Sequence, residues 1–254
     1  TAPPTDDKPH FFHFFKWRSL PELLSHKEQG GLPLLEWGYP VLVATLVQAA
    51  LASLLLIGLP LAWAGIRQKD QRMAPLAGSR GRVLAYFLAI GFAFMFIEIA
   101  FIQKFVLFLS HPLYAVAVVL FSFLLFAGIG SGVSGRLRLA PAAVAGALPG
   151  SALLCLLVLP WLFRHAMGLQ DAVRILVSIA LIAPLAFFMG MPFPQGLARV
   201  EAADAGLIPW AWGINGCASV TAAVLATLLA IHVGFTAVVV MALLLYGVAA
   251  AARP

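Results

Sequence analysis

About seven predominantly apolar runs dominate this chain, most of them long enough to cross a lipid bilayer. They cover residues 39–65, 82–109, 113–133, 141–163, 172–191, 209–232 and 235–252. A crossing needs roughly 20 apolar residues, and its backbone groups must hydrogen-bond within the segment, so each run is expected to be helical. The sequence therefore predicts an all-α fold, a polytopic transmembrane helical bundle of about seven crossings.

The composition agrees with a protein whose main partner is the lipid bilayer. Hydrophobic residues make up 62% of the 254 residues and charged residues 10%. The mean hydropathy is +0.98. Because a soluble domain carries about 25% charged residues, these values exclude an ordinary soluble globular enzyme.

Residues 1–38 differ from everything that follows, because charged residues and aromatic rings alternate there. Rings flanked by charges suit the headgroup region of a membrane, so residues 10–37 are predicted to form an interfacial aromatic collar. We therefore divide the chain into an extramembrane or interfacial segment, 1–38, and a transmembrane domain, 39–254. The chain opens at Thr1 with no methionine and no signal-peptide pattern, which indicates a processed product or the tail of a longer polypeptide.

The basic residues gather in particular loops and at the C-terminus, which predicts the orientation of the bundle. The loops after the first, third and fifth runs and the C-terminus are expected to be cytoplasmic, which places residues 1–38 outside. Positive-inside bias explains the isoelectric point near 9.8, and no nucleic-acid partner is expected. The residues are Arg67, Lys69, Arg72, Arg80, Arg82, Arg136, Arg138, Arg199 and Arg253.

Glu98 is the most unusual residue in the apolar runs, because a carboxylate in a membrane is costly unless it is paired or protonated. Two roles are open: a carboxylate that binds a proton or cation in a cavity, or a structural pin bonded to an arginine, hydroxyl or amide. Lys104 lies about 240° further around the helix, so it is expected to extend toward the outer interface together with Gln103. Asn215, on another helix, is the better candidate partner.

Two glycine-containing motifs interrupt the apolar runs. Residues 128–136 hold the glycines of a phosphate loop but neither its lysine nor its strand–loop–helix setting, so they indicate a helix end followed by cytoplasmic Arg136. Residues 189–196 contain two prolines and two glycines, which predict either a rigid turn or a broken helix lining a cavity.

Small residues at four-residue spacing are expected to mark helix contacts. They are Gly128 with Gly132, Gly146 with Gly150, and the stripe Ala218, Ala222, Ala226 and Ala230.

The sequence contains no recognisable arrangement of catalytic residues. The histidines lie at run ends or in loops, and Cys155 and Cys217 lack metal-ligand spacing, so both are expected to be free thiols. We expect no catalytic residue, no metal site and no cofactor in this chain.

Three segments, 94–104, 111–115 and 130–136, resemble the membrane region of bacterial spermidine-synthase-like proteins, the fused major-facilitator and spermidine-synthase type. In that family a glutamate-bearing helix, a turn, and a helix ending in a glycine–serine–arginine signature recur; here Ser131 and Arg136 match the signature. Residues 190–194 and 212–216 are also similar. Residues 5–9 are similar to the stretch that closes the family's aminopropyltransferase-like domain.

The resemblance implies a multi-pass domain of the bacterial inner membrane, similar to major-facilitator transporters, with an aminopropyltransferase-like domain upstream. This sequence does not contain that domain's glycine-rich fingerprint or acidic catalytic residues, so the chain is expected to be non-catalytic in itself. Two functions remain open. One is binding or translocation of a polyamine-like cation by Glu98, Gln103 and Asn215. The other is a structural anchor or accessory subunit packed against partner subunits in a larger membrane complex.

Overall fold

A computed structural model describes residues 7, 38–60, 63, 77–136, 141–166 and 168–253. Apart from Asp7, the predicted collar and the rest of residues 1–37 lie outside the described part. Every regular element in the described part is helical. The elements are α2 (Gly38–Ser53), the π-helical turn η4 (Leu54–Gly58), α4 (Ala77–Leu109), α5 (Pro112–Ser134), α6 (Pro141–Ala166), α7 (Asp171–Met189), α8 (Pro192–Asp204), the 3-10 turn η6 (Ala205–Leu207), α9 (Ile208–Val233) and α10 (Phe235–Ala251).

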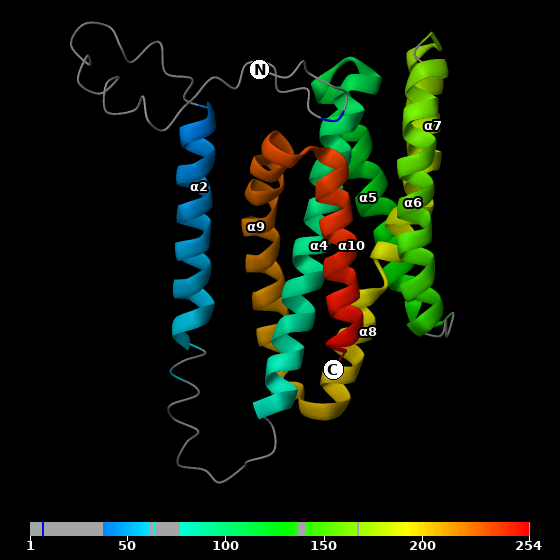
Figure 1. Cartoon of the computed structure of the whole chain (residues 1–254). Helices are drawn as coiled ribbons and strands as arrows, with labels where there is room; N and C mark the ends of the chain where they lie inside the picture. Colours follow the sequence, from blue (N-terminus) through cyan, green and yellow to red (C-terminus); the bar gives the residue numbers. More distant parts are fainter. Residues whose placement is uncertain are drawn as a thin grey trace, which may run out of the picture.

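Helix α4 is the centre of the bundle (Figure 1). Helices α9 and α10 pack along it, α5 packs on α4 and α7, and α6 packs on α7 and touches α10. Helix α2 lies at the edge beside α9 (Figure 1) and buries none of its residues. Two polar contacts accompany this packing, because the Tyr39 hydroxyl lies 3.4 Å from His232 Nε2 and the Ser53 and Thr221 hydroxyls are also 3.4 Å apart.

The all-α membrane fold is confirmed, whereas the count of about seven crossings is not. Among the described residues, five stretches are long and apolar enough to span a bilayer. The longest, Asp171–Val233, is divided into α7, α8, η6 and α9, and the apolar helix α10 is shorter, at 17 residues. Large apolar side chains such as Leu124, Leu157 and Trp161 are exposed on the outside of the bundle, as a lipid environment requires.

Proline and glycine set several helix boundaries. Pro112, Pro192 and Pro209 lie in the first turns of α5, α8 and α9, where a missing N–H costs nothing. Of residues 189–196, only Gly190 and Met191 form the turn between α7 and α8, and Pro192 begins α8. Gly234 (φ 95°) separates α9 from α10. This φ lies in the left-handed region that favours glycine.

The glycine pairs predicted as helix contacts do not make them with the described residues. Gly128, Gly132, Gly146 and Gly150 are exposed, and a Cβ placed on any of them would meet nothing within 4 Å. Spacing alone does not say which face of a helix turns inward, and these pairs face away from the described helices. The alanine prediction is confirmed: Ala218, Ala222, Ala226 and Ala230 are all buried on α9.

Candidate functional site

Glu98 lies inside the bundle, on the central helix. Glu98 is only 5% exposed. By helix spacing, Phe94, Phe101 and Phe105 lie on the same side of α4 as Glu98. Their rings contact Phe123 of α5 or one another. The carboxylate is therefore placed beside an aromatic face of the core.

No described residue forms a hydrogen bond or an ion pair with the Glu98 carboxylate. Asn215, the partner expected from the sequence, donates its side-chain amide to the Phe87 carbonyl at 3.1 Å. It also lies against Gly91, where an added Cβ would meet it within 2.9 Å. Gly91 precedes Glu98 by about 10 Å along the helix axis. The structure therefore assigns Asn215 to the contact between α9 and α4 and not to Glu98.

Gln103 faces α9, on another side of α4 from Glu98. Its Nε2 donates to the Thr227 hydroxyl at 3.3 Å, and its Oε1 is buried with no hydrogen-bond donor among the described residues. An unsatisfied buried amide oxygen is costly. Gln103 Oε1 is therefore a free acceptor inside the bundle, although it is not joined to Glu98.

Lys104 reaches the N-terminal end of α10 and is buried there. The residue is 9% exposed, and its amine lies 3.5 Å from Asp7 Oδ1 and 3.5 Å from the Thr236 hydroxyl. Asp7 Oδ1 also accepts hydrogen bonds from the Thr236 backbone N–H and hydroxyl, and the Asp7 carbonyl accepts from Phe235 N–H. A carboxylate is favourable at a helix N-terminus, so Asp7 both caps α10 and neutralises Lys104.

The two residues of the loop signature lie at the opposite end of the bundle from Lys104. Ser131 is within α5, and its carbonyl accepts a hydrogen bond from the Ser134 hydroxyl at 2.7 Å. Helix α5 then ends at Ser134, and Arg136 is exposed just beyond it. This agrees with the helix end predicted for residues 128–136.

Glu98, Gln103 and Asn215 therefore do not converge on one point. No group of three or more histidine, cysteine, aspartate or glutamate side chains in the described part could hold a metal ion. The sequence reasoning also missed a cavity between α4, α6, α8 and α10, whose polar lining residues include Tyr86, Gln195 and Arg199. In the sequence, Arg199 indicates only the orientation of the bundle.

No protein-family model, curated protein or solved structure matches this chain at a significant level.

Proposed function

We propose that this chain is the non-catalytic membrane domain of a bacterial spermidine-synthase-like inner-membrane protein, and that it binds or translocates a small polyamine-like cation. Glu98 is the counter-charge for that cation. The observation that carries the proposal is the burial of Glu98 at 5% exposure with no partner among the described residues. The resemblance of residues 94–104 and 130–136 to the family supplies the substrate class.

A buried carboxylate without a partner needs a proton or a cation. Lys104 does not supply that charge, because its amine is paired with Asp7 and it points from a different side of α4. An organic ammonium group would neutralise Glu98. It would also gain cation–π attraction from the faces of neighbouring rings such as Phe101 and Phe105.

Asp7 connects the membrane domain to the N-terminal segment and, in the proposed protein, to the domain upstream of it. Through its contacts with Lys104 and Thr236, it joins the segment before α2 to the same helix that carries Glu98. In the proposed protein the upstream aminopropyltransferase-like domain carries out the chemistry, and the membrane domain handles its cationic substrate or product.

One observation favours the second function, an accessory subunit in a larger complex. The exposed glycine pairs of α5 and α6 leave room for another helix to approach closely. In that arrangement Glu98 is a structural pin, and the bundle carries no solute.

The Glu98→Gln variant separates the two functions, because it removes the charge and keeps the shape of the side chain. Wild-type protein in proteoliposomes should bind and take up radiolabelled spermidine, and Glu98→Gln should lose both while remaining folded. Glu201→Gln is the matched control, because Glu201 is exposed on α8 and should behave as wild type. Unchanged binding and uptake by folded Glu98→Gln would contradict the role of Glu98 as the counter-charge. No spermidine binding by the wild type would leave the accessory function.

A further inference from the structure

A groove of about 450 Å³ lies between α2, α4 and α9, at the edge of the bundle where α2 lies beside α9 (Figure 1). Its walls come from residues 50–57 of α2 and η4, 84–92 of α4 and 214–221 of α9, and we call it the lateral groove. Helix α9 packs on both α2 and α4, whereas α2 and α4 make no comparable contact with each other. Helix α9 therefore forms the floor, and the groove opens between α2 and α4.

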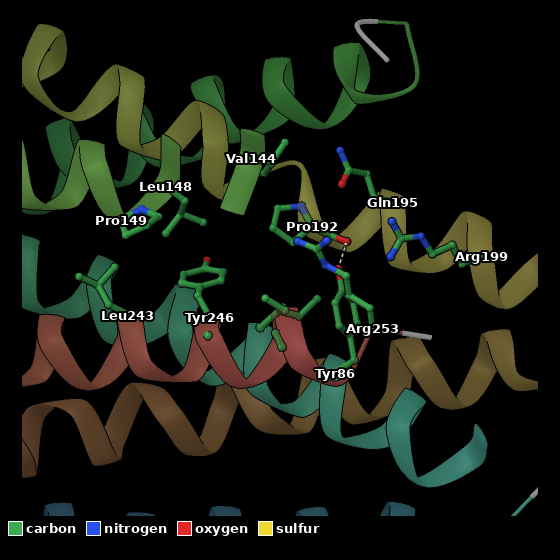
Figure 2. A pocket seen from close by; sticks show the side chains of 14 residues that line it. Tyr86, Val144, Leu148, Pro149, Pro192, Gln195, Arg199, Leu243, Tyr246 and Arg253 are labelled. Atoms are coloured by element: carbon green, nitrogen blue, oxygen red, sulfur yellow. Dashed lines mark hydrogen bonds between the residues drawn. The ribbon is translucent and has the colours of Figure 1, made fainter. Parts of the chain in front are cut away.

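The lining of the lateral groove is apolar. None of the described residues that line it is charged, and the hydroxyls of Ser53 and Thr221 lie only 3.4 Å from each other. The cavity between α4, α6, α8 and α10 is different, because Arg199 and Arg253 belong to its lining (Figure 2). A polar ligand in the lateral groove would lose its hydrogen bonds to water and gain few in return. The groove therefore suits an apolar ligand.

The lateral groove is about as long as one leaflet of a bilayer is deep. Its α4 wall, from Leu84 to Phe92, covers about 12 Å at 1.5 Å per residue. Half of a hydrocarbon core of about 30 Å is about 15 Å. Arg80 and Arg82 precede this wall on the same helix, by no more than about 6 Å along its axis. The groove therefore begins near the arginine-rich end of α4 and ends near the middle of its apolar span, Arg80–Leu109.

We propose that the lateral groove binds one acyl chain of a phospholipid from the leaflet at the arginine-rich end of the bundle. The chain lies along the groove, and the phosphate of the same lipid lies at the level of Arg80 and Arg82, whose positive charge attracts it. A helix of a second copy fits less well, because it crosses both leaflets, about 30 Å, and the groove covers less than half of that length. This site does not depend on the role of Glu98.

A phospholipid with a photoactivatable diazirine group in its acyl chain tests the proposal in proteoliposomes of the full chain. After irradiation, the lipid adducts are mapped by mass spectrometry of the peptides. Every lipid-facing helix should carry some adduct, so the exposed residues Leu124 of α5 and Leu157 of α6 provide the baseline. We expect residues 84–92 and 214–221 to carry several-fold more adduct than this baseline, because a bound chain stays beside them longer than bulk lipid does.

Filling the groove should remove this excess of adduct. Ala85 is an exposed residue of the α4 wall, so Ala85→Phe places a ring where the chain lies and should lower the adduct on residues 214–221 to the baseline. Ala117→Phe is the matched control, because Ala117 is exposed on α5 and does not line the groove. If Ala85→Phe does not fold, Ala50→Phe fills the same groove from the α2 wall.

Three results would overturn the proposal. Adduct at the baseline level in the groove of the wild type would mean that the groove holds only bulk lipid. An excess that persists in the folded groove-filling variant would place the bound chain elsewhere. A dimer that light scattering detects in the wild type, and that the groove-filling variant converts to a monomer, would assign the groove to a second copy of this chain.

Discussion

Lys104 remains inside the bundle because Asp7 and Thr236 provide its partners there. The amine lies 3.5 Å from each of them. The side chain of Lys104 is 11% exposed and that of Asp7 is 36% exposed, so the lysine depends on the pair more than the aspartate does. Removing the partner of a buried charge costs more than removing a partner that water can replace.

This asymmetry predicts the stability of two variants. Asp7→Asn should lower the free energy of unfolding by about 1–2 kcal/mol, because it leaves the Lys104 charge unpaired. Lys104→Met should cost less, since Asp7 stays solvated and still caps α10. The double variant should recover part of the loss of Asp7→Asn. Denaturant unfolding of all four proteins in micelles measures this cycle, and strictly additive effects would contradict the pairing.

Sequence reasoning located the costly residue of α4 but not its surroundings. A carboxylate inside an apolar run is visible in one sequence, and the helical period excluded Lys104 as its partner. The period cannot reveal contacts between distant segments, so Asp7 beside Lys104 and Asn215 beside Phe87 were both missed. The arginines of the cavity were missed for the same reason, since Arg199 is on α8 and Arg253 follows the end of α10.

Helices α5 and α7 approach most closely at two glycines that the spacing rule did not select. A Cβ on Gly130 would lie 2.0 Å from the Phe187 carbonyl oxygen, and one on Gly190 would lie 2.0 Å from the Ala127 carbonyl oxygen. Backbone atoms cannot move aside as the end of a flexible side chain can. These two glycines therefore set the distance between the helices, whereas Gly128 and Gly132 face outward.

Gly130 and Gly128 form a matched pair for testing this packing. Gly130→Ala should force α5 and α7 apart and destabilise the protein by about 3 kcal/mol or more. Gly128→Ala, two residues away on the same helix, should stabilise it by about 0.5–1 kcal/mol, because alanine favours the helix and meets no atom. Thermal unfolding of both variants in micelles measures the difference. Equal effects would mean that Gly130 does not set the contact.

The two ends of the whole bundle differ in charge. Arg82, Arg136, Arg199 and Arg253 lie near the ends of α4, α5, α8 and α10 that share one side of the bundle (Figure 1). At the other end, Arg174 is paired with Asp171, just as Lys104 is paired with Asp7.

Apolar run length was enough to predict the helices and their alternating directions. It could not fix the number of crossings, because the last apolar helix, α10, is shorter than a usual crossing, at 17 residues.

The charge difference predicts that the end with Arg136 faces the cytoplasm. In a variant that lacks both native cysteines, through Cys155→Ala and Cys217→Ala, one thiol is placed at either end of the bundle. His165→Cys, exposed at the end of α6, should react with a membrane-impermeant maleimide in intact spheroplasts. Arg136→Cys should react only after the membrane is permeabilised.

Labelling of both variants after permeabilisation is the control for thiol accessibility. Reaction of Arg136→Cys in intact spheroplasts would place the arginine-rich end outside. The cavity lined by Arg199 and Arg253 would then open toward the external face. The orientation of the bundle therefore decides from which side of the membrane the cavity can be reached.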